Sequence, residues 1–443
     1  MNITIIGTGY VGLVSGVCLA SKQHNVTCVN IREEVVNSLN NNQPHIYENG
    51  LPELLEQTIK NGYFKATTDL NGALEQSELV IIAVGTPSKN GRINLTQIKN
   101  ACISIGNFIK TSNKFISVVV KSTVIPGTTD TFVKNTIEST SGKKLGEFGL
   151  GMNPEFLREG EAITDFQHPD RIIIGYEDEK TKDLLEEIYS PWDCDKIVVN
   201  TRTAEMIKYS NNTLLACLIS MNNELSNLAL KLGNINYNDV IKGVISDKRW
   251  SPIVNKTRIT PTITNYFTPG AGFGGSCFPK DVQAIRAQGE YLGLSMNMTD
   301  AILSVNDTQH YKVLHYLKNY FGKLTGKKIL LLGLAFKPDT DDIRESSALK
   351  ILSTLLENNC QVKAHDPISI PNAKKEFNNS NLEFIENWRD EINNVDAIII
   401  GTNWPEYKDI KDKTNVLIFD SKQLFSIDEV KNHKYATFSY NKK

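Results

Sequence analysis

The sequence lacks any long apolar run, any clustered cysteine motif and any excess of one charge. No segment has about 18 consecutive uncharged apolar residues, so we expect no transmembrane helix and no membrane partner. Lysine and arginine total 48 against 50 aspartate and glutamate residues, which argues against the basic field of a nucleic-acid-binding protein. No basic segment followed by an apolar core opens the chain, so a secretory signal is not expected.

The seven cysteines are scattered, and no CxxC pair occurs. We therefore expect neither a disulfide framework nor a metal site, and a reducing, cytoplasmic location. Cys18, Cys28 and Cys217 lie in apolar runs and are predicted to be small core residues. Cys277 differs, because glycine and charged residues surround it.

Short apolar runs alternate with helical segments in the first and last parts of the chain, which predicts α/β domains with doubly wound parallel sheets. Between them, residues 201–232 have helical periodicity, and Gly233 ends it. An irregular stretch over 246–269 follows, and helical signal resumes after Pro279 as far as Phe321. The expected domains are 1–200, a helical connector with one long helix over 201–322, and 323–443.

A glycine motif, Gly7-Thr-Gly9-Tyr10-Val11-Gly12, follows the first predicted strand and opens the first predicted helix. In this context it predicts a Rossmann-type dinucleotide site, because glycines allow a tight turn and a close approach of the pyrophosphate. The pyrophosphate would lie at the helix N-terminus. The alternative is a glycine-rich turn without a ligand.

Asn30 ends the second predicted strand, where dinucleotide-binding domains usually have an acid that bonds the adenosine ribose. An amide repels a 2′-phosphate less than a carboxylate does, and Arg32 would attract one. NAD is favoured by analogy with related folds, and NADP stays open. In the other interpretation Arg32 is solvated and Asn30 still bonds the ribose.

The segment GAGFGGSCFPKD, from Gly270 to Asp281, lets the backbone approach a ligand closely. Pro279 suits the first turn of a helix, which would place Cys277 at a helix N-terminus beside Lys280. The helix dipole and the lysine charge both favour the thiolate. Asp281 would orient the thiol or a water. Alternatively it only caps the helix, and Cys277 is a buried cysteine in a turn.

Polar side chains also recur on the long helix and after two strands. Lys208 and Asn212 share one helix face, where they would hold an oxyanion, unless the lysine is simply solvated. Glu155 and Glu159 follow a strand at the edge where parallel sheets bind ligands, and one is a candidate general base. The alternative interpretation is that both are carboxylates of a turn with no role in catalysis. Thr123 ends another strand and would bring a hydroxyl to the same crevice.

A last motif, residues 333–345, follows the first strand of the second α/β region without the GxGxxG spacing. Its basic residues Lys337 and Arg344 are candidates for phosphate binding. The acidic run 339–342 is predicted to form turns and caps.

Taken in order, these motifs resemble those of the UDP-glucose 6-dehydrogenases, within the UDP-glucose/GDP-mannose dehydrogenase family. The resemblance extends from Met1 to about Asn403, and GGSCFPKD is its most specific motif. It implies an N-terminal Rossmann domain for NAD, a helical connector that forms a homodimer or a higher homo-oligomer, and a C-terminal Rossmann-like domain for UDP. It also implies two NAD-dependent oxidations that convert UDP-glucose to UDP-glucuronate, a precursor for polysaccharide or glycan synthesis.

The resemblance further implies roles for single residues. Cys277 would be the nucleophile that forms a thiohemiacetal and then a thioester. Glu155 would be the base for hydrolysis, through a water near Thr123, and Lys208 and Asn212 would stabilise the oxyanion. The implied catalytic set is Cys277, Lys208, Asn212, Asp281, Glu155 and Thr123.

Binding residues are implied in the same way. Cofactor contacts are implied for Gly7, Gly9, Tyr10, Val11, Gly12, Asn30, Arg32, Val35, Thr86, Thr123, Glu159, Lys280 and Arg344. Substrate contacts are implied for Phe156, Leu157, Arg158, Glu159, Lys208, Asn212, Tyr266, Phe267, Thr268, Pro269, Gly270, Gly274, Phe336 and Lys337.

Two departures from the family pattern leave alternatives open. Asn30 replaces the usual acid, and an inserted loop separates Arg249 from Tyr266, so either Arg249 or Arg258 would take the cross-subunit role of a family arginine. Phe278 favours UDP-glucose as the substrate. The alternatives are the same chemistry on GDP-mannose or a UDP-N-acetylhexosamine, and a nucleotide-sugar-binding protein without catalysis.

Overall fold

The computed structural model describes residues 1–89, 91–411, 413–426, 429–430 and 434–440. The chain divides into two compact units, Met1–Asn211 and Asn212–Lys443, and the division falls inside the long helix α9 (Thr201–Leu232). The bounds of α9 are those predicted from its periodicity. The finer division into three domains stays a prediction.

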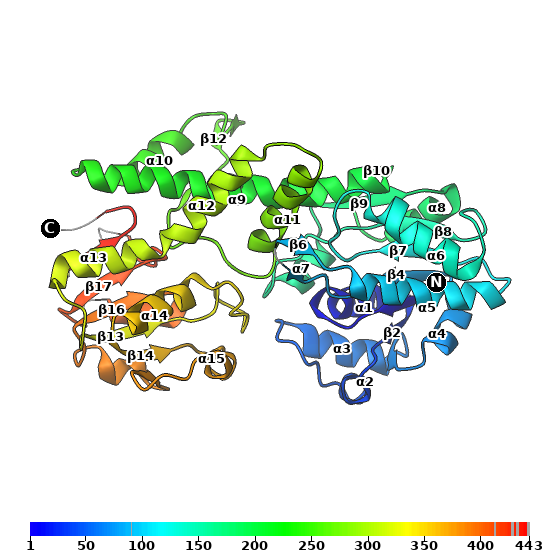
Figure 1. Ribbon diagram of the computed structural model, residues 1–443, viewed down its shortest axis with the longest axis horizontal. Helices are drawn as coiled ribbons and strands as arrows, with labels where there is room; N and C mark the ends of the chain where they lie inside the picture. The colour runs from blue at the N-terminus through cyan, green and yellow to red at the C-terminus, as the bar shows by residue number, and fades with distance from the viewer. Residues whose placement is uncertain (90, 412, 427–428, 431–433, 441–443) are drawn as a thin grey trace. The chain divides into compact units, whose positions relative to one another are not determined.

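The first unit is built on an eight-stranded sheet, which Figure 1 shows in colours from blue to green. Its spatial order is β10 (Asp195–Asn200), β9 (Arg171–Tyr176), β8 (Gly149–Met152), β7 (Ser117–Val120), β4 (Leu79–Ile82), β1 (Asn2–Ile6), β2 (Asn25–Val29) and β3 (Phe64–Thr67). The six strands from β3 to β8 have the doubly wound order of a dinucleotide-binding fold, as predicted. One junction differs, because β8 and β9 pair antiparallel. The connection between them, residues 153–170, contains the short α7 (Ala162–Gln167) and returns the chain to the sheet in the opposite direction.

Helices cover both faces of this sheet. They are α1 (Tyr10–Ser21), α2 (Glu33–Asn40), α3 (Leu51–Lys60), α4 (Leu70–Gln76), α5 (Thr96–Thr111), α6 (Lys134–Ser141) and α8 (Glu179–Ile188), with a π-helix η1 (Thr128–Val133) and a hairpin of β5 (Ser88–Lys89) and β6 (Arg92–Ile93). Leu79 and Ile81 of β4 pack into one core and Val80 and Ile82 into the other. Because successive strand residues point to opposite faces, a strand buried on both sides is apolar throughout.

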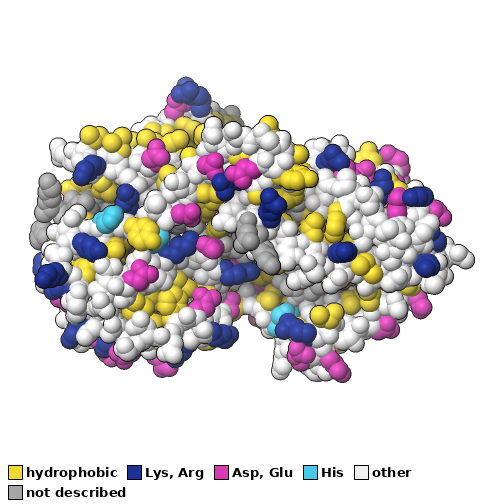
Figure 2. Space-filling view, in the orientation of Figure 1, with side chains coloured by type: hydrophobic (Ala, Val, Ile, Leu, Met, Phe, Trp, Pro, Cys, Tyr) yellow, Lys and Arg dark blue, Asp and Glu magenta, His cyan; other side chains and the backbone are white. Residues whose placement is uncertain are grey.

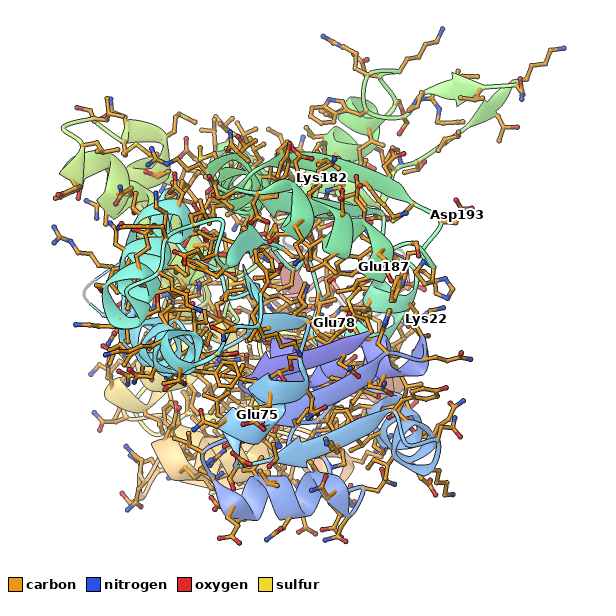
Figure 3. All side chains as sticks on the ribbon, turned by 90° about the vertical axis from the view of Figure 1, so that its right-hand side faces the viewer. Lys22, Glu75, Glu78, Lys182, Glu187 and Asp193 are labelled. Carbon is orange, nitrogen blue, oxygen red and sulfur yellow. The ribbon has the colours of Figure 1, made fainter. Side chains whose placement is uncertain are left out.

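The amino-terminal edge of this sheet carries charges with structural partners. Figure 3 labels Glu78 near the start of β4, where its carboxylate accepts a hydrogen bond from the Asn2 backbone at 2.9 Å. Lys22, also labelled there, lies over the Trp192 ring at 5.5 Å from the centroid. The motifs singled out in the sequence follow the strands and so lie at the opposite, carboxyl edge.

The second unit contains a six-stranded parallel sheet. Its order is β15 (Leu382–Phe384), β14 (Gln361–His365), β13 (Lys328–Leu332), β16 (Ala397–Ile400), β17 (Leu417–Asp420) and β18 (Tyr435–Thr437). The connecting helices are α14 (Ser347–Glu357), α15 (Ile370–Glu376), η3 (Trp388–Glu391) and η4 (Pro405–Ile410). This order repeats that of the first unit's six strands, so the prediction of two Rossmann-like sheets is confirmed.

The rest of the second unit is helical. After α9 come α10 (Tyr237–Ile245), α11 (Phe278–Tyr291), α12 (Asn297–Gln309) and α13 (Tyr311–Phe321). The helical signal after Pro279 is therefore three helices rather than one run, with a break at Gly293, whose φ of +79° ends α11. The stretch expected to be irregular contains a hairpin of β11 (Ile253–Val254) and β12 (Thr257–Arg258) and a 3-10 helix η2 (Thr262–Phe267).

Two expected absences can be compared with the structure. Among the described residues, no helix has the length and apolar character that a membrane span requires. Within the same residues, no group of three His, Cys, Asp or Glu side chains is placed to hold a metal ion. No disulfide joins any of the seven cysteines, all of which lie among the described residues. Cys18 and Cys28 are buried as predicted, whereas Cys217 is only half-buried.

Candidate active site

The glycine motif forms a sharp turn between β1 and α1. The Gly7 N–H donates to the Val29 carbonyl at 3.0 Å, and its φ of +102° is one that side chains disfavour. A Cβ at Gly7 would lie 2.6 Å from the Ala83 carbonyl oxygen, and one at Gly12 would lie 2.1 Å from the Gly7 oxygen. A Cβ at Gly9 would meet none of the described atoms within 4 Å. The turn is therefore packed on its inner side and open at Gly9, which fits the pyrophosphate of NAD.

Tyr10, the first residue of α1, belongs to a buried hydrogen-bond network that the sequence did not indicate. Its hydroxyl donates to Glu48, a carboxylate only 4% exposed. Glu48 also accepts from the backbone N–H groups of Gly160 and Ala162, each at 2.7 Å. Burial, then the Glu48 carboxylate, raise the pKa of Tyr10. Glu48 thus ties the glycine turn to the segment that carries Glu159.

The end of β2 places Asn30 beside the same turn. Its Nδ2 donates to the Thr8 hydroxyl at 2.5 Å, and its Oδ1 accepts from the Arg32 N–H at 2.8 Å. Arg32 is exposed, whereas Val35, also expected at the cofactor, is buried in the core of the unit. Of these three residues, Asn30 has the closest contact with the turn.

Glu155 and Lys208 form a buried ion pair in the first unit. Lys208 Nζ lies 2.8 Å from Glu155 Oε1 and donates to the Glu155 carbonyl at 2.7 Å, and the two side chains are 4% and 6% exposed. Burial alone would raise the pKa of Glu155, but the Lys208 charge and hydrogen bond outweigh it, so the pKa is lowered. At neutral pH Glu155 is therefore a carboxylate, and it positions the ammonium group of Lys208.

A second lysine, Lys121, lies near this pair. Its Nζ donates to Asn153 Oδ1 at 2.7 Å, and burial lowers its pKa to about 8, although the Glu155 charge acts in the opposite direction. Two residues further on, the Thr123 carbonyl accepts from the Thr86 hydroxyl at 2.9 Å. The structure thus joins two residues expected at the cofactor.

The segment after Glu155 carries the other predicted contacts of the first unit. Leu157 donates its N–H to Glu155 Oε2 at 2.7 Å, which folds the chain back on the ion pair. Phe156 has the Arg171 guanidinium 4.1 Å from its ring centroid. Arg158 is exposed and held by Asp165, with its NH2 group 2.6 Å from Oδ1.

Cys277 lies in the second unit at the N-cap of α11. The Asp281 N–H donates to the Cys277 carbonyl at 2.8 Å, and Pro279 occupies the first turn, as predicted. Gly275, two residues earlier, has a φ of +81°, and a Cβ there would lie 2.8 Å from the Phe336 ring. The thiol is half-buried, and its sulfur lies 3.6 Å from the Ser276 hydroxyl.

Asp281 is the centre of a polar network next to Cys277. Its side chain is 1% exposed and accepts from Asn212 Nδ2 at 2.7 Å and from Lys280 Nζ at 2.5 Å. Asn212 is itself 5% exposed. The predicted residues Asn212, Lys280, Asp281 and Cys277 are thus brought together within one unit, and the arrangement combines a thiol, a buried carboxylate and two N–H donors.

The remaining predicted contacts of the second unit lie in two loops. In the first, Gly270 donates its N–H to Asn223 Oδ1 at 2.8 Å, and the Pro269 carbonyl accepts from Gln423 Nε2 at 2.8 Å. In the second, Lys337 lies over the Phe336 ring, 5.9 Å from its centroid. Of the other predicted contacts, Tyr266 and Phe267 end η2, Thr268 follows it, and Gly274 and Arg344 lie in the same loops.

Lys422 was not identified in the sequence. It follows β17, and its Nζ donates to the Ser347 hydroxyl at 3.2 Å, at the start of α14. Burial lowers the pKa of Lys422 to about 8. A cation beside a helix N-terminus is unfavourable unless an anion binds there, so Lys422 is a candidate phosphate ligand. No local motif marks it, because β17 and α14 are far apart in the sequence.

The two arginines around the inserted loop have different surroundings. Arg249 is exposed and paired with Asp247, its NH2 group 2.5 Å from Oδ2. Arg258 NH1 donates to the carbonyls of Ser246 and Ser251, each at 2.9 Å. Arg258 therefore helps to hold the inserted hairpin, while the Arg249 guanidinium reaches solvent.

Comparisons with known proteins place this chain among dehydrogenases. Residues 1–193 match the NAD binding domain of the UDP-glucose/GDP-mannose dehydrogenase family, 202–308 its central domain and 330–427 its UDP binding domain. The UDP-glucose 6-dehydrogenase of Rickettsia conorii is 38% identical over 413 residues, which cover 93% of this chain and 91% of that protein. The UDP-glucose 6-dehydrogenase YwqF of Bacillus subtilis is 36% identical over 438 residues, covering 97% and 95%. A solved UDP-glucose dehydrogenase from Pyrobaculum islandicum has 36% identity and a TM-score of 0.90, covering 99% of this chain and 97% of that one.

Proposed function

Because the chain belongs to the UDP-glucose/GDP-mannose dehydrogenase family of NAD-dependent oxidoreductases, we propose that it oxidises C6 of UDP-glucose twice, to UDP-glucuronate. The observation that carries the proposal is the group around Cys277, a thiol at a helix N-cap beside the buried network of Asp281, Lys280 and Asn212. Such a thiol suits a reaction that passes through an aldehyde, because a covalent adduct holds the intermediate between the two oxidations.

The first unit binds the cofactor. NAD, when bound, accepts a hydride in each oxidation. The turn at Gly7–Gly12 holds the pyrophosphate at the N-terminus of α1, and Asn30 lies where the adenosine ribose is bonded in this fold. Thr86 and Thr123 are the proposed contacts toward the nicotinamide end.

Cys277 acts after the first oxidation. Its sulfur forms a bond to the C6 aldehyde carbon, and the aldehyde oxygen takes up a proton, giving a thiohemiacetal. Loss of a hydride and a proton from this adduct gives the thioester. Water then attacks the thioester carbon, the C–S bond breaks, and the carboxylate product and the Cys277 thiol are released.

Charged groups stabilise the oxygen at C6 through these steps. Lys208 supplies an ammonium group that Glu155 orients, and Asn212 supplies an amide held by Asp281. Glu155 is ionised at neutral pH, as a general base for the hydrolytic water must be, although Lys208 lowers its proton affinity. Lys337 and Lys422 would bind the diphosphate of the nucleotide in the second unit.

The test is the stoichiometry and fate of the sugar. With UDP-glucose and excess NAD, two NADH form for each UDP-glucuronate. Cys277→Ser lowers turnover by roughly 10³-fold or more, because a serine hydroxyl lacks the acidity and nucleophilicity of the thiol. The matched control is Cys217→Ser, a half-buried cysteine of the same unit, which keeps activity. One NADH per sugar with release of free aldehyde would overturn the proposal, as would full activity in Cys277→Ser.

The inserted hairpin of β11 and β12 favours a second candidate substrate, since it lies between the helical region and the loop of Tyr266–Gly270. The same chemistry on GDP-mannose or a UDP-N-acetylhexosamine would then apply. Initial rates across these sugars and UDP-glucose decide between them. Binding of UDP-sugars without any NADH formation would instead indicate a protein without catalysis.

The exposed apolar residues of α9 and α10 support a homodimer or a higher homo-oligomer. Leu225, Leu228 and Leu232 of α9 are 46%, 55% and 68% exposed, and Val240 and Val244 of α10 are 41% and 45% exposed. Figure 2 shows hydrophobic side chains gathered over α10. Contiguous apolar surface of this kind is usual at subunit interfaces. Light scattering after gel filtration tests the assembly, and a monomer at working concentration would contradict it.

A further inference from the structure

The loop after β17 is a turn built on one buried carboxylate. Asp420, the last residue of the strand, is 0% exposed, and its side chain accepts the Lys422 N–H at 3.1 Å and the Phe425 N–H at 3.2 Å. Because one side chain bonds both parts of the turn, it stabilises a single conformation of residues 421–425. Lys422 and Gln423, which follow each other in this turn, therefore leave from one fixed piece of backbone.

Gln423 has a backbone conformation that its residue type disfavours. Its φ is +52°, and four of the nine described non-glycine residues with positive φ are asparagines, which tolerate this conformation better. Three of the nine, Gln423 with Asp339 and Glu345, lie in loops at the carboxyl edge of the second sheet, where the proposed phosphate ligands also lie. Such a conformation persists where surrounding contacts hold it, and it is concentrated at functional sites.

The side chain of Gln423 bonds a loop that is distant in the sequence. Its Nε2 donates to the Pro269 carbonyl at 2.8 Å. The two backbones also touch, because a Cβ at Gly270 would lie 3.0 Å from the Ser421 carbonyl oxygen. Pro269 and Gly270 end the segment 266–270, in which every residue is an expected substrate contact, and we call this segment the sugar loop.

The side chain of Lys422 bonds a different element. Its Nζ donates to the Ser347 hydroxyl at 3.2 Å, at the start of α14, where it is a proposed ligand of the nucleotide diphosphate. Two neighbouring residues of one turn thus bond the proposed phosphate site and the sugar loop. The diphosphate and the sugar of a nucleotide sugar are covalently joined, so the sites that bind them must lie a set distance apart. The bond from Gln423 to the sugar loop fixes that distance.

Other residues hold the chain between the sugar loop and Cys277. Asn306 accepts from the Phe273 N–H at 2.7 Å and donates to the Phe273 carbonyl at 3.1 Å. The Gly275 N–H donates to the Arg344 carbonyl at 2.9 Å. Releasing the sugar loop should therefore leave the thiol in place.

We propose that Gln423 is a positioning residue for the sugar, because its bond to Pro269 fixes the sugar loop relative to the phosphate site of Lys422. The inference rests on the proposed function and deepens it, since it names the side chain that couples the two halves of the substrate site. Loss of the bond weakens the contacts to the sugar and spares those to UDP.

The direct test is calorimetry of the full chain with UDP and with UDP-glucose, in the absence of NAD so that no turnover is needed. Gln423→Gly removes the bond and adopts the positive φ without strain. It is expected to weaken UDP-glucose binding about fivefold, roughly the loss of one hydrogen bond between neutral groups, and UDP binding less than about twofold. Gln423→Asn tolerates the same φ with a side chain one methylene shorter, and it should behave in the same way.

Two results would overturn the inference. Equal losses of affinity for both ligands would place Gln423 in the phosphate site rather than between the two sites. Unchanged affinity for both ligands would show that the bond to Pro269 does not position the sugar.

The alkylation rate of Cys277 distinguishes positioning from a general structural role. In Gln423→Gly, site-specific alkylation by iodoacetamide should keep its rate within about twofold of the wild type, because the thiol and its helix N-cap are held independently. A larger change would show that the variant disturbs the whole glycine-rich segment, and it would contradict the assignment.

The matched control is Asn359→Gly. Asn359 is exposed, has a φ of +57° and precedes β14 at the amino-terminal edge of the same sheet. The change removes a side chain from the same backbone conformation and should leave the ratio of UDP-glucose to UDP affinity unchanged. A ratio shifted as much as in Gln423→Gly would contradict a specific role for Gln423.

Kinetics separate this inference from the proposed reaction. With NAD and UDP-glucose, kcat/KM of Gln423→Gly should fall at least as much as the affinity for UDP-glucose does. If the wild type oxidises no UDP-glucose but the loss is still confined to UDP-glucose binding, the inference stands and the proposed reaction fails. If the wild type oxidises UDP-glucose and both variants bind both ligands as the wild type does, the proposed reaction stands and the inference fails.

Discussion

The two sheets contain the same strand–turn element, yet only the first is built for a dinucleotide. Gly7 follows β1 and bonds the end of β2, and Gly333 follows β13 and bonds the end of β14, with N–H to carbonyl distances of 3.0 and 2.7 Å. Both glycines have positive φ, +102° and +94°. The elements differ in the residue after the second strand, which is Asn30 in the first unit and Asp366 in the second.

The two residues use their side chains differently. Asn30 bonds the Thr8 hydroxyl, whereas the Asp366 carboxylate accepts from the backbone N–H groups of Leu334 and Ala335 at 2.8 and 3.1 Å. These are the groups that face a pyrophosphate in a dinucleotide turn. An internal anion therefore already occupies the place of the phosphate in the second unit.

The helix that follows each turn differs too. In the first unit α1 begins at Tyr10, three residues after Gly7, so its N-terminus lies at the turn proposed to hold the pyrophosphate. In the second unit α14 begins only at Ser347, and the loop between carries Lys337. The same strand order is thus compatible with the two proposed ways of binding phosphate, through a helix N-terminus at the turn or through lysines nearby.

The largest expected effect is on the free energy of unfolding, when the carboxylate of Asp366 is removed. Asp366 is 2% exposed and accepts five hydrogen bonds, including one from the Trp404 indole. Asp366→Ala leaves these donors without an acceptor and should cost about 3–5 kcal/mol of unfolding free energy. The matched change Asn30→Ala should cost about 1 kcal/mol or less. Urea unfolding followed by circular dichroism measures both, and similar costs would contradict the comparison.

The next effect concerns pH. Burial raises the pKa of Glu205 to about 7, although its bonds from Thr129 and Gly127 act in the opposite direction. The unfolded carboxyl titrates near ~4.3, so between these values the folded protein holds a proton that the unfolded chain has released. The stability contributed by this group is therefore complete below pH ~4.3 and falls as pH rises toward 7, by roughly 4 kcal/mol.

Glu205→Gln should flatten the stability profile over that window, and Glu75→Gln, an exposed carboxylate labelled in Figure 3, should not. The measurement is the urea midpoint from pH 5 to 8. In the second unit burial raises the pKa of Asp420 to about 6. Asp420→Asn should therefore flatten the stability profile over a lower pH range than Glu205→Gln does. A profile unchanged in Glu205→Gln would show that its carboxyl titrates normally.

A smaller effect separates the two glycines. Gly7→Ala forces a Cβ to 2.6 Å from the Ala83 carbonyl and should distort the turn, weakening NADH binding by roughly 30-fold, about 2 kcal/mol. In Gly333→Ala the new Cβ would lie 2.4 Å from the Thr402 Cβ. This substitution should lower the free energy of unfolding, while NADH affinity changes less than threefold. Fluorescence titration with NADH distinguishes them, and equal losses of affinity would mean that both turns bind the dinucleotide.

The smallest effect tests the alternative phosphate ligand. Lys422→Gln removes the cation beside α14 and should weaken UDP binding about tenfold, or ~1.4 kcal/mol, with NADH binding unchanged. Calorimetry with UDP measures it, and Lys408→Gln, a lysine of η4, is the control. Unchanged UDP affinity in Lys422→Gln would remove this lysine from the site.

Much of the local structure follows from neighbouring residues, and the sequence was sufficient for it. The glycine turn, the bounds of α9 and the position of Cys277 at a helix start were all predicted from patterns within one element. The antiparallel pairing of β8 and β9 was not, because strand direction depends on how the chain returns to the sheet. The hairpin of β11 and β12 was missed because two-residue strands leave no periodicity.

The sequence by itself determined which residue types are present at the ends of the strands, and hence the family. Only the tertiary structure decided which of them meet: Glu48 with Tyr10, Asp281 with Asn212, Asp366 with the second turn and Lys422 with Ser347. The physical reason is that parallel strands bring their carboxyl ends to one edge from distant parts of the chain. There burial and hydrogen bonding, which no local pattern encodes, set the charge and position of each side chain.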